Sequence, residues 1–218
     1  MNKVLVVAAH PDDELLGVGG TVCRHTRNGD EVRSVIMCEG ESLRYGKNVG
    51  LKEATQEAAE ILGVAQVYSL DFPDQKLDTY SLTDIIMPLE EISETYRPDI
   101  IYCQSASDAN RDHKLLFEAA NVAFRPTSRW VREFYCFYTA SSTEWGMPKS
   151  FVPDTWVDIS DTIEDKVRAF ERYRSEARPY PHPRSPEALR HQGHYWGNQC
   201  CMDYAEVLMT IRRTFRGQ

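Results

Sequence analysis

The chain opens with the stretch that decides its fold, VLVVAAHPDDELLGVGGT at residues 4–21. A hydrophobic run, Val4–Ala9, ends at His10 and is followed at once by three acidic residues at positions 12–14. Such a run is typical of a buried strand, and Pro11 fits the first position of a helix, whose first turn favours carboxylates. Open α/β sheets place their functional sites at this strand-to-helix edge. The stretch therefore predicts a strand, a helix and a cluster of potential metal ligands between them.

A second stretch, SASDANRDHKLLFEAA at residues 105–120, repeats this arrangement. An apolar run, Ile100–Cys103, precedes a polar turn, and the pair Asp112-His113 opens a helix. Either acidic helix start alone could be ordinary capping. Two such clusters can converge, however, because the carboxyl ends of parallel strands meet at one edge of a sheet. We therefore expect the side chains of both turns to share a site.

Strand-like and helical segments alternate through the first 125 residues, which predicts βαβ units and a mostly parallel sheet. We expect strands at Val4–Ala9, Glu31–Cys38, Gln66–Leu70, Ile100–Cys103, Phe134–Thr139 and Thr155–Ile159. We expect helices at Pro11–Arg27, 51–62, Leu82–Tyr96 with a kink or break at Pro88, His113–Phe124, Thr162–Ala177 and Ala188–Phe215, and a loop at Arg178–Pro186. The whole chain, 1–218, is expected to form one α/β domain.

Composition excludes several classes of partner. The chain has 218 residues, of which 42% are hydrophobic, and a formal net charge of −8, so a nucleic-acid partner is not expected. The longest apolar runs are too short to span a bilayer, and we find no leader sequence. The six cysteines lack CxxC spacing and mostly lie in apolar stretches, which is typical of core residues in a reducing compartment. We therefore expect a cytoplasmic protein.

The residue types of the two clusters favour metal-assisted hydrolysis. His10, Asp13 and His113 offer two imidazoles and one carboxylate, which suits a catalytic Zn²⁺ with three protein ligands. Such a set does not select strictly, and Fe²⁺ or another divalent ion would also fit. Asp12 remains as a carboxylate beside the metal, where it could act as the general base that activates a water molecule.

The two motifs together, AHPDDE at residues 9–14 and the later DH, resemble the LmbE/PIG-L family of zinc-dependent N-deacetylases. The segments at 71–78, 141–145, 157–160 and 177–185 extend the resemblance, and the last three are similar to a branch associated with bacterial sugar and polysaccharide biosynthesis. The resemblance implies a Rossmann-like three-layer α/β/α sandwich that removes an N-acyl group, usually acetyl, from an amino sugar carried on a larger group. It implies zinc ligation by His10, Asp13 and His113, with Asp12 as the base.

One departure from the family pattern concerns proton transfer. Many relatives carry a histidine three residues before the second ligand histidine, where this chain has Asn110, whose amide can donate a hydrogen bond but carries no proton to transfer. Either Asn110 suffices for the oxyanion, or another histidine substitutes. His182 is the first candidate because its proline-flanked loop could present it to the site, and His191 and His194 follow.

Four charged residues are the expected substrate contacts. By resemblance, the loops that contain Arg44 and Asp74 face the sugar, and Arg178 and Arg184 flank His182, where they could grip a phosphate. The expected substrate is therefore a small amino sugar, free or linked to a nucleotide or lipid phosphate. Relatives are often multimeric, so the resemblance also implies a homo-oligomer.

Three alternatives stay open at this point. The first is a zinc amidohydrolase that acts on another acyl group or on a non-sugar amide. The second is a dinucleotide-binding module, suggested by the βαβ opening and the glycines at residues 17–20, although those glycines lie well inside the expected helix rather than in the turn. The third is a metal-binding protein without catalysis, which would leave the spare carboxylate of Asp12 without a role.

Overall fold

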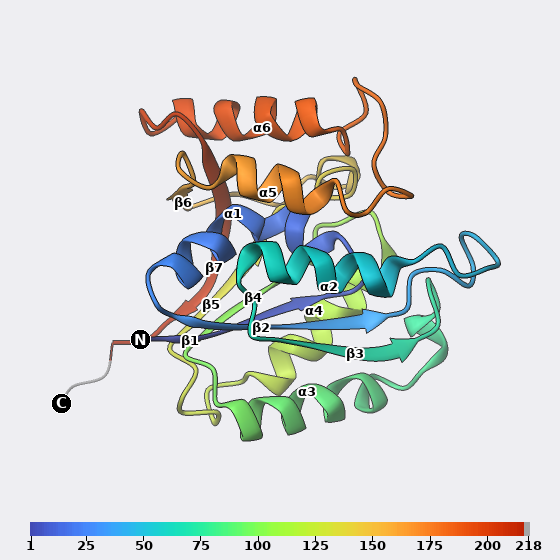
Figure 1. The fold of residues 1–218 in the computed structure, drawn as a ribbon. Coiled ribbons are helices and arrows are strands. Elements are labelled where there is room, and N and C mark those ends of the chain that lie inside the picture. The colour runs from blue at the N-terminus through green and yellow to red at the C-terminus, as the bar shows by residue number, and fades with distance from the viewer. Residues whose placement is uncertain (216–218) are drawn as a thin grey trace.

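Seven strands form one sheet in the order β3-β2-β1-β4-β5-β7-β6 in the computed structural model, which describes residues 1–215 (Figure 1). The strands are β1 (Lys3–Ala8), β2 (Glu31–Cys38), β3 (Gln66–Phe72), β4 (Ile100–Gln104), β5 (Glu133–Phe137), β6 (Thr155–Asp158) and β7 (Ala205–Arg213). The neighbours among β1 to β5 pair in parallel, whereas β7 pairs antiparallel with both β5 and β6. The predicted α/β class and mostly parallel sheet are confirmed.

Helices cover both faces of the sheet and make three layers (Figure 1). One side carries α1 (Asp13–Arg27), α2 (Leu51–Leu62), α5 (Ile163–Phe170) and α6 (Pro186–Asn198), and the other carries α3 (Leu82–Tyr96) and α4 (Arg111–Ala123). Two short 3₁₀ helices, η1 (Leu77–Thr79) and η2 (Thr143–Trp145), lie in loops. Side chains of β1 alternate between the layers, because Val4 and Val6 join the core under α1 and α2 while Leu5 and Val7 join the core under α3 and α4.

The strand order reverses direction at β1, which lies between β2 and β4. The chain leaves β1 for β2 on one side and later returns to β4 on the other, and this is the point at which open α/β sheets place their functional sites. His10 follows β1 and His113 lies in the first turn of α4, which follows β4. The topology therefore brings the two predicted clusters to one edge of the sheet.

The expected helix Ala188–Phe215 is wrong in its second half. Helix α6 ends at Asn198, where the Met202 N–H donates to the Gly197 carbonyl (3.0 Å) and Cys201 adopts a left-handed φ of 57°. The chain then enters β7, which finds strand partners on both sides. A nine-residue segment rich in apolar residues is compatible with both helical and strand periodicity, so pairing in the sheet decides its conformation.

Three smaller expectations also differ. Helix α5 ends at Phe170 instead of Ala177, and the following residues turn toward the carboxyl edge of the sheet. Helix α3 runs through Pro88 without the expected break. Pro11 lies in the turn before α1 rather than at its first position, because Asp12 adopts a φ of 99° that a helix cannot contain.

Helix α1 bends at Val18, whose φ and ψ are not helical. The bend frees backbone groups, and a buried ion pair satisfies them: the Glu206 carboxylate accepts from the N–H groups of Gly20 (2.9 Å) and Thr21 (2.7 Å). Lys166 donates to the Leu16 carbonyl (3.0 Å) and to Glu206 (2.6 Å). A strand and a helix from the second half of the chain thus fix the shape of α1.

The glycines of the opening motif lie inside α1 and serve packing. A Cβ on Gly17 would lie 2.2 Å from the Phe137 ring, and one on Gly20 would lie 2.8 Å from Ile159. These positions are not in the strand-to-helix turn, where a dinucleotide-binding fingerprint must lie. The structure therefore disfavours the dinucleotide-binding alternative.

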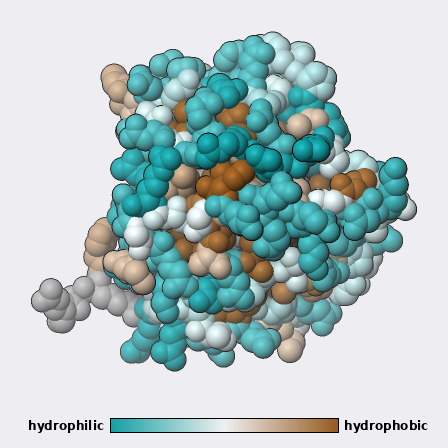
Figure 2. All heavy atoms as spheres, viewed as in Figure 1, coloured by the Kyte–Doolittle hydropathy of each residue, from teal (hydrophilic) through white to brown (hydrophobic). Residues whose placement is uncertain are grey.

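The face shown in Figure 2 is mostly hydrophilic, with apolar side chains visible between polar ones. Among the helices of residues 1–215, none is both long enough and apolar enough to cross a membrane.

Candidate metal centre

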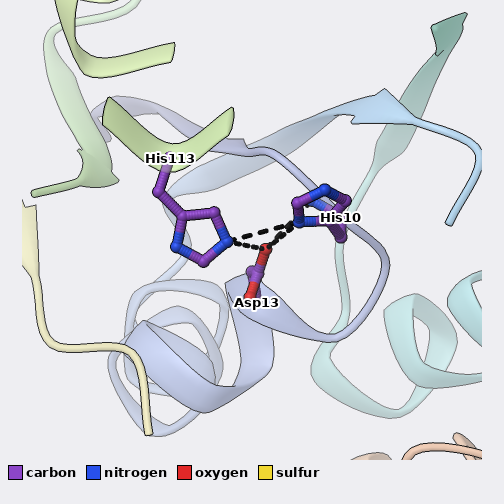
Figure 3. A group of neighbouring side chains, drawn as sticks. All are labelled: His10, Asp13 and His113. Carbon is purple, nitrogen blue, oxygen red and sulfur yellow. Dashed lines mark hydrogen bonds and ion pairs between the residues drawn. The ribbon is translucent and has the colours of Figure 1, made fainter. Parts of the chain in front are cut away.

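Three side chains from two turns meet at the carboxyl edge of the sheet (Figure 3). His10 comes from the turn after β1, Asp13 from the first residue of α1, and His113 from the first turn of α4. The His10 Nδ1 atom lies 3.2 Å from Asp13 Oδ2 and 3.3 Å from His113 Nε2, and the last two atoms are 3.2 Å apart. The three atoms form a nearly equilateral triangle, and all three residues are buried.

This triangle fits a metal ion. Tetrahedral ligands with bond lengths near 2.0–2.1 Å lie roughly 3.4 Å from one another, close to the separations found here. In addition, the buried Asp13 Oδ1 atom has no hydrogen-bond partner among the described residues. The two imidazole nitrogens also lie close to each other and to one carboxylate oxygen. A cation bound between these three atoms would accept a lone pair from each of them at once. The donor set and its spacing suit Zn²⁺ or a similar divalent ion.

A buried carboxylate orients His113. The Nδ1 atom of His113 lies 2.7 Å from Asp108 Oδ2, and the other Asp108 oxygen accepts from the Thr143 hydroxyl. Asp108 is fully buried in the turn between β4 and α4. The bond fixes the tautomer that leaves Nε2 free as a metal ligand, which is the usual arrangement around a ligating histidine.

His10 is oriented in the same way. Its Nε2 atom lies 3.1 Å from Asp112 Oδ2, and the other Asp112 oxygen accepts from the Leu77 N–H (3.1 Å). Asp74 Oδ1 lies 3.5 Å from the same nitrogen, and Gln75 Nε2 lies 3.1 Å from it. A hydrogen bond to Asp112 turns Nδ1, rather than Nε2, toward the triangle.

Electrostatics in the metal-free protein favour a charged cluster. Burial disfavours ionisation of Asp13, but His113 and His10 outweigh it and hold the pKa of Asp13 well below its usual range. Burial would lower the pKa of His113, yet Asp13 and Asp108 raise it to about 9. The negative charge of Asp13 is therefore available to attract a cation, and His113 must lose a proton when it binds one.

Asp12 lies beside the triangle and is held by an arginine. Arg184 Nη1 donates to Asp12 Oδ2 (2.9 Å) and to Glu176 Oε2 (2.9 Å), and Arg184 Nε donates to Ser141 Oγ (2.7 Å). Burial raises the pKa of Asp12 well above its usual value, and Arg184 opposes that rise. A buried carboxylate next to a metal site and not needed as a ligand can serve as a base.

The remaining predicted catalytic residues have other contacts. Asn110 caps α4, since its Oδ1 accepts from the Asp112 N–H (2.9 Å). The half-buried His182 accepts from the Arg184 N–H (3.0 Å) and packs edge-on against Trp145. Partial burial and the nearby arginines lower the pKa of His182. His182 thus adjoins the Asp12 network through Arg184, and the catalytic roles of Asn110 and His182 stay predictions.

The predicted substrate residues fall into two groups. Arg44 donates to Glu176 (2.8 Å), so Arg44 and Arg184 share one buried carboxylate, while Arg178 is exposed and donates to the Ser175 carbonyl (2.5 Å). Asp74 is fully buried beside His10, and its Oδ2 atom has no partner among the described residues. Asp74 and Arg184 contact residues of the site, Arg44 is joined to Arg184 through Glu176, and the contacts of all four to substrate stay predictions.

Sequence reasoning missed three carboxylates. Asp108 and Asp112 lie in the second motif that supplied His113, and a ligating histidine regularly needs a carboxylate partner, so a signal for both was present. Glu176 is different, because it reaches the site from the segment after α5, which periodicity assigned to the helix. Its burial at 1% exposure is visible only in the fold.

Comparison with known proteins gives matches over most of the chain. The PIG-L family, described as GlcNAc-PI de-N-acetylase, matches residues 5–124. "Uncharacterized deacetylase YaiS" of Escherichia coli K12 is 32% identical over 178 residues, which are 79% of this chain and 90% of the relative. "Diacetylchitobiose deacetylase" of Thermococcus kodakarensis is 28% identical over 190 residues, which are 81% of this chain and 70% of the relative.

A solved structure shares the fold but carries a different name. The 4-carboxy-2-hydroxymuconate hydratase GalB of Pseudomonas putida KT2440 superposes with a TM-score of 0.78 at 22% identity, covering 100% of this chain and 99% of that one. A likeness at this identity establishes the fold alone, and one fold can host several chemistries. The choice of reaction must therefore rest on the residues of the site.

Proposed function

The chain belongs to the PIG-L family, and from that premise we propose that it is a metal-dependent hydrolase that removes the N-acetyl group from an amino sugar or its conjugate. The family match includes both motifs that supply the candidate site, and the curated relatives reported above are named deacetylases. The relatives establish the class of reaction for their family. The metal, the residues and the substrate of this chain belong to the proposal.

The observation that carries the proposal is the triangle of His10, Asp13 and His113 with a second acidic residue, Asp12, beside it. A structural metal site would use all of its ligands and need no base. A catalytic site needs three protein ligands, an open position and a proton acceptor. The arrangement supports catalysis rather than simple metal storage.

The residues divide the work of amide hydrolysis. When bound, Zn²⁺ or Fe²⁺ would polarise the attacking water and the substrate carbonyl. Asp12 takes the proton from the water as it attacks, and the same carboxyl group returns a proton to the leaving amine. Asp108 and Asp112 hold the two histidines in the tautomers that face the ion. Asn110 and His182 remain the candidates for stabilising charge on the carbonyl oxygen.

The proposed substrate is an N-acetylated amino sugar, free or joined to a nucleotide, lipid phosphate or second sugar. The Asp74 Oδ2 atom, which has no partner among residues 1–215, supports hydrogen bonding to sugar hydroxyls, because a buried acceptor without a partner is costly. Arg44 is the second proposed sugar contact, and the exposed Arg178 is the proposed phosphate contact. The six cysteines are all free, which supports a reducing compartment such as the cytoplasm.

Acetate release from purified protein tests the proposal. The panel contains N-acetylglucosamine, N,N′-diacetylchitobiose and a nucleotide-linked N-acetylhexosamine, each with zinc and with chelator. We expect chelator-sensitive release from at least one of them. Bound zinc without release from any sugar would favour the other reading, an amidohydrolase for a different acyl group or a non-sugar amide.

Two substitutions assign the roles. Asp12→Asn should keep one zinc per chain and lose turnover, whereas His113→Ala should lose the zinc. Asp161→Asn, at an exposed position remote from the triangle, is the matched control and should change neither. Retained turnover in Asp12→Asn would show that another group is the base.

A further inference from the structure

Arg184 is unusually well fixed for an arginine in a loop. Its guanidinium donates to three side chains, Asp12, Glu176 and Ser141, and its side chain is 15% exposed. The backbone is fixed as well, since the Arg184 carbonyl accepts from the Arg178 N–H (3.0 Å). A side chain held at both ends presents its charge at one place, so it loses little rotamer freedom when it binds a partner.

Glu176 holds this arginine in place. Its carboxylate is buried and also accepts from Arg44 (2.8 Å) and from the Tyr45 hydroxyl (2.7 Å). The anchor therefore joins the loop after β2 and the segment after α5 to the turn that carries Asp12. The Glu176 carboxylate thus accepts hydrogen bonds from two guanidinium groups and one hydroxyl, which holds Arg184 in place.

The contact to Asp12 is selective for one oxygen. Arg184 Nη1 holds Oδ2, and the pair leaves Oδ1 for other partners. General-base catalysis requires that the accepting oxygen lie within hydrogen-bond reach of the proton, and small misplacements of a catalytic group cost about 10²-fold in rate. The backbone at Asp12, with φ at 99°, does not by itself fix the carboxylate plane.

We propose that Arg184, anchored by Glu176, is the positioning residue of Asp12: it clamps Oδ2 so that Oδ1 is the oxygen that receives the proton from the attacking water. The inference rests on the proposed function, in which Asp12 is the base. It replaces the expectation that Arg184 grips a substrate phosphate, because its guanidinium already binds two carboxylates and a hydroxyl.

The test compares Arg184→Ala with Arg190→Ala as a matched control, since Arg190 makes an exposed ion pair with Glu164 away from the site. The probes are N,N′-diacetylchitobiose and N-acetylglucosamine. We expect Arg184→Ala to lower kcat by about 10²-fold while KM and zinc content change little. Added guanidinium chloride, below denaturing concentrations, should restore part of kcat in Arg184→Ala and nothing in the control.

Two further variants separate positioning from folding. Arg184→Lys should recover only part of the activity, because one ammonium cannot reproduce the planar fork that reaches three partners. Arg184→Ala should add no further loss in an Asp12→Asn background, since residues that act through one another are not additive. A crystal structure of zinc-loaded Arg184→Ala, which needs no substrate, should show the Asp12 carboxylate rotated from its place.

The outcomes distinguish this inference from the proposed function. An unchanged kcat with a raised KM would make Arg184 a substrate contact, and loss of zinc or an unmoved Asp12 would also overturn the inference. None of these results bears on Asp12 as the base. Conversely, full turnover in Asp12→Asn would overturn the base assignment, whatever the Arg184 variants show.

Discussion

Replacement of Asp108 by asparagine is the most direct test of how the fold prepares the metal site. Asp108 Oδ2 lies 2.7 Å from His113 Nδ1, and both residues are at most 1% exposed, so water cannot replace the bond. Hydrogen bonds to charged groups contribute about 1.5–3 kcal/mol. Because 1.4 kcal/mol is about tenfold in a dissociation constant, zinc should bind roughly 10- to 100-fold more weakly.

The geometry explains why asparagine cannot substitute. If the amide nitrogen faces His113 Nδ1, two N–H groups oppose each other or the imidazole adopts the wrong tautomer. If the amide oxygen faces it, the nitrogen faces the Thr143 hydroxyl and the charge is still lost. Competition with a chromogenic chelator measures the zinc dissociation constant, and Asp161→Asn is the control. A dissociation constant equal to that of the parent protein would refute the view that Asp108 orients His113.

Three further predictions follow from buried contacts. Glu206→Gln should lower the free energy of unfolding by about 3–5 kcal/mol, because it leaves Lys166 buried without its 2.6 Å partner. Urea unfolding measures this change, and a loss below about 1 kcal/mol would contradict the prediction. Gly146→Ala would place a Cβ 1.7 Å from the Ser107 carbonyl oxygen, so the turn that carries Asp108 must move, and both the melting temperature and the zinc affinity should fall. His113, with its pKa raised to about 9, is protonated in the metal-free protein at neutral pH. Zinc binding should therefore release a proton, and the zinc affinity should fall by up to about tenfold for each pH unit below about 9. Titration calorimetry in buffers of different ionisation enthalpy counts the released proton. Zinc binding that does not depend on pH would contradict the assignment.

Local signals were enough to predict the first half of the fold. The opening strand, the helix after it and the two polar turns each follow from hydrophobic runs and helix starts, and parallel pairing then brings the turns together. The proximity of His10, Asp13 and His113 could be foreseen for that reason. The conformation of β7, however, depends on strand pairing. Its residues form a strand because β5 and β6 pair with it on both sides.

The contacts of Arg184 and Glu176 could not be predicted from sequence either, because they too join residues that are far apart in the chain. The Arg184–Asp12 pair spans 172 positions, and the Arg44–Glu176 pair spans 132, so no local spacing predicts either one. The charged segment after α5 has a helical pattern, yet the helix ends at Phe170 and Glu176 accepts charge-assisted hydrogen bonds from Arg44 and Arg184. A tertiary interaction here overrides a local preference.

The place of β7 has a consequence for how this chain folds during synthesis. β7 is the last strand to leave the ribosome, but it lies between β5 and β6, so β6 has no place in the sheet until residues 205–213 have emerged. β1 to β5, and with them His10, Asp13 and His113, can assemble earlier, because Arg184 lies 47 positions after Phe137, the last residue of β5. Native pairings of this sequence separation form slowly. The nascent protein can therefore expose an unpaired edge of β5, and it acquires the three candidate ligands before the arginine that positions Asp12.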